Sequence, residues 1–256
     1  MRMAGLLEVC ADSVCSAVNA ARGGADRIEL CSALPLGGLS PDEDLFCMVR
    51  ERVDIPVRVL LRPRAGDFLY DEDEFELLCR QASRFAGLGA DGIVIGMLNP
   101  DGTLDTERMS ALMACGDGCG VTLHRAFDVC RDAHEALRTA KKLGVDTILT
   151  SGQQARCADG APLLRELVSE SGEGLRILIG GGVNADVIRA LAPQTGADAF
   201  HLSAKAAVPS GMEFRREAVP MGAAGLNEFE LWRCDEGAVR AAREALDAVC
   251  TARKEN

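Results

Sequence analysis

The sequence predicts one parallel (β/α)8 barrel of the TIM-barrel class, with residues 1–256 forming a single domain. Three observations support this prediction. A junction of Gly, then Ala or Val, then Asp precedes an apolar run four times, at residues 24–26, 89–91, 144–146 and 196–198. Short apolar runs alternate along the chain with segments of helical periodicity. The chain has 256 residues, and a barrel of this class typically has about 250.

Each repeated junction marks the passage from a helix to the next strand. A glycine in the left-handed conformation commonly ends a helix, and here a short polar residue then precedes the strand. The apolar runs give eight expected strands, at residues 6–11, 27–32, 57–63, 92–98, 121–127, 147–152, 176–182 and 199–204. An open doubly wound sheet is the alternative for alternating strands and helices, but the short and regular repeat favours a closed barrel.

Helical spacing of apolar residues is clear at residues 75–85 and again at 239–250, which predicts helices there. The exception to the repeat is the segment 205–235 after the eighth strand, which contains Gly and Met. It is too long for an ordinary loop, so we expect an extended flap or a contact between copies of the chain.

Composition and charge exclude several classes of partner. Hydrophobic residues make up 48% of the chain but aromatic residues only 4%, which is typical of an aliphatic barrel core. The formal net charge of −11 argues against binding to nucleic acid or to an anionic membrane. The chain begins without an apolar signal segment, and its 11 cysteines are an odd number. We therefore expect a cytoplasmic protein with reduced thiols.

The most informative polar residues come in two carboxylate–thiol pairs. Glu8 and Cys10 stand near the end of the first expected strand, and Glu29 and Cys31 near the end of the second. Because side chains alternate along a strand with a period of two, both members of each pair lie on the same face. In barrels of this class the functional site lies at the C-terminal ends of the strands.

Further polar residues fall at the same expected rim. Together with the two carboxylates they form the predicted catalytic set of Glu8, Glu29, Arg62, His124, Arg125, Asp128 and His201. The carboxylates and histidines suit proton transfer, and the arginines suit the binding of an anion. The alternative is a structural ion network that closes the top of the barrel, with the histidines as hydrogen-bonded core residues.

A glycine run follows the seventh expected strand, where many barrels bind phosphate through backbone N–H groups. The residues predicted for this anion or phosphate site are Gly180, Gly181, Gly182, Ser203 and Ala204. The same glycines also suit a tight turn without any ligand.

Cys10 and Cys31 are the best candidates for metal ligands. Neighbouring strands lie about 4.8 Å apart, so the two sulfur atoms are expected to come close enough to share one soft ion. Thiolates with few hard ligands suit Cu(I). The alternative is that both are packing residues, since free cysteine is among the most buried residue types.

Long stretches of the chain resemble the CutC family, which is linked to copper homeostasis. The similar stretches lie at residues 8–13, 23–32, 62–68, 124–128, 149–152, 180–182, 201–204, 210–215 and 221–222. The resemblance implies a cytosolic barrel, usually a homodimer or a higher homo-oligomer, with a Cu(I) site at Cys10 and Cys31. The sequence departs from the family pattern at Ala65, where the family often has Gly, and at Gln153.

Two functional hypotheses follow. The first is a copper homeostasis protein that binds Cu(I) through Cys10 and Cys31. The second is an enzyme of the lyase, isomerase or hydrolase type that acts on a small anionic substrate, such as a phosphorylated one. In that case Glu29, Glu8 or His124 would transfer protons, and Arg62 with Arg125 would hold the anion.

Overall fold

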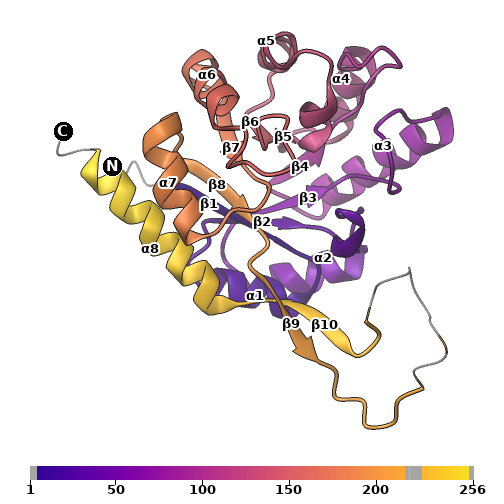
Figure 1. Ribbon diagram of the computed structural model, residues 1–256. Helices are drawn as coiled ribbons and strands as arrows, with labels where there is room; N and C mark the ends of the chain where they lie inside the picture. The colour runs from indigo at the N-terminus through magenta and orange to yellow at the C-terminus, as the bar shows by residue number, and fades with distance from the viewer. Residues whose placement is uncertain (1–4, 217–218, 220–226, 254–256) are drawn as a thin grey trace.

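The computed structural model describes residues 5–216, 219 and 227–253. Eight parallel strands pair in chain order and close into a barrel, because β1 also pairs with β8. This confirms the predicted fold class (Figure 1). The barrel strands are β1 (Leu6–Ala11), β2 (Arg27–Leu30), β3 (Val57–Leu60), β4 (Gly92–Ile95), β5 (Gly120–Leu123), β6 (Thr147–Thr150), β7 (Arg176–Ile179) and β8 (Ala199–Leu202).

A helix follows each of the first seven strands, and a last helix follows the segment after β8. The α-helices are α1 (Val14–Arg22), α2 (Glu43–Arg50), α3 (Glu72–Gly87), α4 (Thr106–Cys115), α5 (Ala133–Leu143), α6 (Ala161–Ser171), α7 (Ala185–Thr195) and α8 (Glu236–Ala252). Two short 3-10 helices, η1 (Leu34–Leu36) and η2 (Arg125–Val129), lie in the loops after β2 and β5. Within the described ranges, no helix is both long and apolar enough to cross a membrane.

The repeated Gly-Ala/Val-Asp junctions have the predicted conformation. Their glycines all have positive φ, from +79° at Gly196 to +95° at Gly24. The aspartates have a role that the sequence did not reveal, since three of them accept a hydrogen bond from the backbone of a neighbouring strand: Asp26 from Leu7 (2.7 Å), Asp91 from Val57 (2.8 Å) and Asp146 from Val121 (2.7 Å). These three junctions therefore both end a helix and anchor the base of an adjacent strand.

The strands end earlier than the sequence predicted. From β2 to β8, the expected strands continue two to four residues beyond the observed ends. The prediction is wrong there because apolar residues continue into the loops: Leu61, Met97 and Phe127 are buried although they lie outside the strands. Buried loop residues extend the apolar pattern of the sequence, whereas a strand ends where its hydrogen bonds to the neighbouring strands end. The last residues of each expected strand therefore form the rim loops.

Side chains of β1 alternate between the helices and the interior of the barrel. Leu7 and Val9 pack with residues of α7 and α8, so Glu8 and Cys10 point inward. Nearer the N-terminal ends of the strands, the interior is filled by an apolar cluster of Leu6, Leu149, Leu178 and Ala199. The buried guanidinium of Arg58, bonded to Thr122 and Asp146, shares this lower part of the interior.

The segment after β8 leaves the barrel as an antiparallel hairpin. Its strands, β9 (Lys205–Pro209) and β10 (Glu230–Cys234), pair with each other and project away from the barrel (Figure 1). This agrees with the extended segment predicted at 205–235. Residues 221–222, which belong to the stretches similar to the family, lie outside the described residues. A role as a flap or as a contact between copies stays a prediction.

Candidate functional site

Three strands bring the ionisable side chains of the site together at the barrel interior. Register pairs Glu8 of β1 with His201 of β8, and Cys10 of β1 with Glu29 of β2. As a result, one ligand atom each of Glu8, Glu29 and His201 lies within 4.8 Å of the other two, and all three side chains are largely buried. The predicted convergence of residues 8, 29 and 201 is therefore present.

Glu8 is the anionic centre of this group. Its Oε2 accepts a hydrogen bond from Nε of Arg27 at 2.5 Å, and its Oε1 lies 2.8 Å from Nδ1 of His201. Burial alone would raise the pKa of Glu8, but the Arg27 charge and the His201 contact lower it to about 2. Glu8 is thus held ionised between two cationic partners.

His201 links the carboxylates to the thiols. Burial lowers the pKa of its ring, but Cys10, Glu29 and Glu8 together raise that pKa well above its ordinary value. The ring contacts Glu8 and also hydrogen-bonds the thiol of Cys10. It therefore places an imidazole directly beside one of the two predicted metal ligands.

Glu29 has the opposite character from Glu8. Burial raises its pKa to about 7, and the neighbouring Glu8 charge adds to the rise. Its Oε2 is buried and has no hydrogen-bond partner among the described residues, and the same holds for Nη2 of Arg27. Buried polar atoms normally have partners, so the free oxygen of Glu29 is suited to a ligand. Arg27 is the first residue of β2 and lines a hollow with Arg58 and Asp146 near the N-terminal ends of the strands.

Cys10 and Cys31 lie on either side of Glu29, across β1 and along β2. Both thiols are free and buried, with no exposed surface at all for Cys31. Burial raises the pKa of Cys31 well above its usual value, and the charges of Cys10 and Glu29 raise it further. Both thiols thus lie beside Glu29 in the buried interior, and their sharing of one metal ion stays a prediction.

Arg62 is placed at the rim, but its contacts differ from those of a free anion clamp. Its Nη1 donates to the carbonyls of Leu36 and Gly38 at 3.2 and 3.1 Å, and its Nη2 donates to that of Gly66 at 2.9 Å. Its guanidinium also lies over the ring of Phe68, 5.2 Å from the centroid. Arg62 therefore joins the loops after β2 and β3.

His124 also contacts Phe68, with the two ring centroids 4.8 Å apart. Its Nδ1 accepts from the backbone N–H of Ala126 at 3.1 Å, while its Nε2 is buried without a partner in the described part of the chain. Burial and the Arg62 charge lower the pKa of His124 to about 3. His124 is thus a neutral imidazole near neutral pH, and it is suited to hydrogen bonding more than to carrying a proton.

Asp128 and Arg125 form a separate group in the loop after β5. Asp128 accepts hydrogen bonds from Oγ1 of Thr150 (2.5 Å), from the backbone and side chain of Ser151 and from the backbone of Gln153. Arg125 donates its Nε to the same carboxylate at 2.6 Å. The carboxylate thus organises the end of β6, and its oxygens face these donors.

The residues predicted to bind phosphate lie at the ends of β7 and β8. A Cβ at Gly180 would lie 3.6 Å from the side chain of His201, so this glycine borders the main cluster. The carbonyl of Gly181 accepts from the backbone of Cys157 at 2.9 Å. Asn184 caps α7 through its bond to the N–H of Val187. At least one backbone N–H group at the N-terminus of α7 is therefore bound by the protein itself. A phosphate site at these residues stays a prediction.

Comparison with known proteins decides the family. The family model described as the CutC family matches residues 5–206. The chain belongs to the CutC family. A CutC family protein from Bacteroides fragilis strain YCH46 is 45% identical over 88% of this chain and 90% of its own length. The human protein named copper homeostasis protein cutC homolog is 44% identical over 92% of this chain and 86% of its own length.

Solved structures agree with the CutC assignment. The crystal structure described as CutC from Streptococcus agalactiae matches with a TM-score of 0.74 at 27% identity, over 78% of this chain and 98% of that one. A thiamine phosphate pyrophosphorylase from Pyrococcus furiosus matches with a TM-score of 0.56 at 18% identity, over 95% and 96% of the two chains. The second likeness shows a shared barrel fold alone.

The part of this chain that matches the CutC family contains every predicted site residue, whereas β10 and α8 lie beyond it. Sequence reasoning missed two members of the site. Arg27 stands two residues before Glu29 on the same strand face, so the strand period was a usable signal. Gly38 lies in the loop over Cys31, where an added Cβ would come within 2.8 Å of Leu60 and 3.7 Å of the sulfur atom. The cytoplasmic location and the homo-oligomeric state stay predictions.

Proposed function

We propose that this CutC-family protein acts in copper homeostasis by binding Cu(I) through Cys10 and Cys31. The observation that carries the proposal is that both thiols are free and buried on the inner face of the barrel, with Cys10 paired in register with Glu29 and Cys31 two residues beyond Glu29. Copper is the cargo in this proposal and enters as an ion without any redox step. The human relative carries copper homeostasis in its name, which supports the choice of metal.

The donor set fits a soft monovalent cation. Two sulfur atoms are ligands that Cu(I) prefers over harder cations. Binding would displace the thiol protons and place a positive charge between two thiolates, which offsets the repulsion and burial that raise the pKa of Cys31. The carboxylates of Glu8 and Glu29 lie in the same cluster and favour a cation there.

The test is an anaerobic Cu(I) titration against a chromophoric Cu(I) chelator. We expect the Cys10→Ser/Cys31→Ser variant to bind one Cu(I) fewer per chain than the wild type. The matched control is Cys130→Ser/Cys157→Ser, which removes two other buried free thiols and is expected to keep that ion. Equal uptake by the wild type and the Cys10→Ser/Cys31→Ser variant would contradict the proposal.

The second candidate function is an enzyme that acts on a small anionic substrate. A specific observation favours it, namely that Oε2 of Glu29 and Nε of Arg62 are both buried without partners in the described structure. In this proposal Glu29 exchanges a proton with the substrate, and Arg62 meets its negative charge through Nε, since both of its Nη atoms already bind loop carbonyls.

A thermal-shift screen of phosphorylated sugars and small carboxylates tests this second candidate. A ligand at 100 times its Kd adds about 2.7 kcal/mol of stability, which raises Tm by roughly 5 to 10 °C for a chain of this length. We expect at least one anion to stabilise the wild type and to lose that effect in Glu29→Gln. A screen without any such anion would count against the enzyme and leave the copper proposal untouched.

A further inference from the structure

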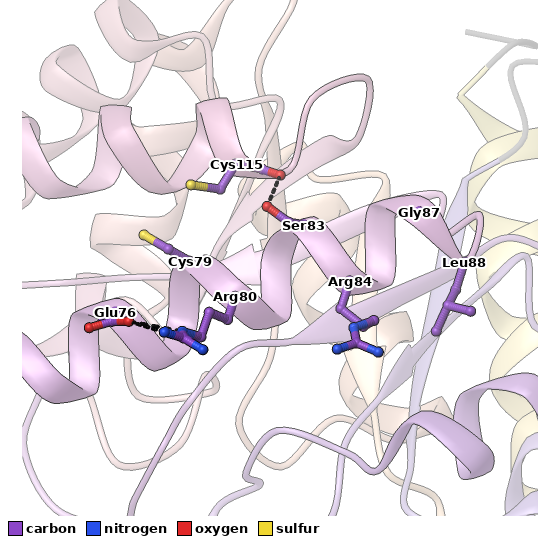
Figure 2. Close-up of a pocket in the computed structure, with 8 residues that line it drawn as sticks. All are labelled: Glu76, Cys79, Arg80, Ser83, Arg84, Gly87, Leu88 and Cys115. Carbon is purple, nitrogen blue, oxygen red and sulfur yellow. Dashed lines mark hydrogen bonds and ion pairs between the residues drawn. The ribbon is translucent and has the colours of Figure 1, made fainter.

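A second pair of thiols lies on the outer surface of the barrel, away from the strand ends. Cys79 of α3 and Cys115, the last residue of α4, are both free and partly exposed. They line one open hollow of about 700 Å³ between the two helices. Figure 2 shows both sulfur atoms on the same side of the hydrogen bond that joins Ser83 to Cys115.

The helices hold this pair in place. Ser83 lies four residues after Cys79 and therefore shares its face of α3. Its Oγ donates to the carbonyl oxygen of Cys115 at 3.1 Å, which fixes the end of α4 against α3 directly beside the thiols (Figure 2). The thiols are thus presented by two packed helices and not by a mobile loop.

The two thiols also affect each other chemically. Burial raises the pKa of Cys79 to about 11, and the hydrogen bond and charge of Cys115 add to the rise. Such a thiol is almost fully protonated near neutral pH, so it is a slow nucleophile in disulfide exchange. A soft metal ion that binds both sulfur atoms must displace both thiol protons, so its affinity for this pair falls as the pH falls.

We propose that Cys79 and Cys115 form a second Cu(I) site, open to solvent and separate from the buried pair at the barrel mouth. Two Cu–S bonds form, the two thiol protons pass to water, and no atom is oxidised or reduced. This inference rests on the proposed function only for the choice of ion, since none of its residues belongs to the barrel-mouth cluster.

Charged side chains also line the hollow. Two thiolates with one Cu(I) carry a net charge of −1, and the hollow is also lined by the guanidinium groups of Arg80 and Arg84. Arg80 is paired with Glu76 of its own helix, and Arg84 lies 3.4 Å from Glu43 of α2. Figure 2 shows both guanidinium groups on the other side of α3 from the two sulfur atoms, and the charge of Glu76 raises the pKa of Cys79.

The experiment is a Cu(I) titration of the fully reduced full-length chain under anaerobic conditions, in competition with a chromophoric chelator. We expect the wild type to bind one ion more than Cys79→Ser/Cys115→Ser, and each single variant to lose the same ion. The Cys10→Ser/Cys31→Ser variant is expected to keep the ion bound by Cys79 and Cys115. A failure of this second site can therefore be distinguished from a failure of the proposed site at the barrel mouth. The control Cys47→Ser/Cys250→Ser removes partly exposed thiols of α2 and α8 and is expected to match the wild type.

A measurement on the wild type makes the test independent of how the variants fold. With Cu(I) bound, we expect Cys79 and Cys115 to react with iodoacetamide about tenfold more slowly, as followed by peptide mass spectrometry, because metal-bound thiolates are shielded. Equal alkylation rates with and without Cu(I) would overturn the proposal. So would an unchanged ion count in Cys79→Ser/Cys115→Ser, or the loss of the ion in only one of the two single variants.

Discussion

Replacing Glu8 with glutamine is expected to lower the free energy of unfolding by about 3 to 5 kcal/mol. The Glu8 side chain has no exposed surface, and it binds both Arg27, at 2.5 Å, and His201, at 2.8 Å. The amide of glutamine lacks the negative charge, so a buried guanidinium and an imidazole would lose their counterion together. Urea unfolding at neutral pH measures the effect as a lower midpoint with an unchanged m value.

Glu29→Gln is the matched control, because it makes the same chemical change in the same buried cluster. Oε2 of Glu29 has no partner among the described residues, so its loss breaks no hydrogen bond. We expect this variant to differ from the wild type by less than about 1 kcal/mol. Similar losses for the two variants would show that Glu8 does not hold the cluster together in the way described.

Asp128→Ala is expected to destabilise the protein by about 3 to 5 kcal/mol, since each buried donor left without an acceptor costs about 1 to 3 kcal/mol. The carboxylate accepts from the Thr150 hydroxyl and from the backbone N–H groups of Ser151 and Gln153. All of these donors stand at the end of β6. Thermal unfolding followed by circular dichroism measures the loss.

The Arg125→Ala variant removes the ion pair with Asp128 but keeps the hydrogen bonds that Asp128 accepts at the end of β6. The Arg125 side chain is 44% exposed, whereas that of Asp128 is 5% exposed, so the arginine charge is returned to water at little cost. We expect Arg125→Ala to lose no more than about 1 kcal/mol. If the two variants were equally destabilised, the carboxylate would act mainly through Arg125, and the hydrogen bonds to β6 would contribute little.

The repeated Gly-Ala/Val-Asp junctions made the barrel predictable from the sequence. Positive φ at Gly144 or Gly196 is a local backbone requirement, and alternation along a strand is also local, so both leave direct marks on the sequence. The same alternation correctly predicts that Glu8 and Glu29 lie on the inner face of the barrel. The meeting of these carboxylates with His201 then follows from closure of the barrel.

The strand ends and the partners of the rim side chains were not predictable in this way. Leu61 and Phe127 are buried as loop residues, and burial alone does not distinguish a loop from a strand. Arg62 has the residue type of an anion clamp, yet it binds carbonyls of loops that follow two different strands. Such pairings depend on loop geometry, which periodicity does not encode.

The most direct test of copper binding at the barrel mouth is the position of copper in crystals of the reduced protein loaded with Cu(I), measured by anomalous scattering at the copper absorption edge. We expect an anomalous peak between the sulfur atoms of Cys10 and Cys31, next to His201. Crystals in which bound copper gives peaks only elsewhere, with the Cys10–Cys31 cluster unchanged, would contradict the central claim.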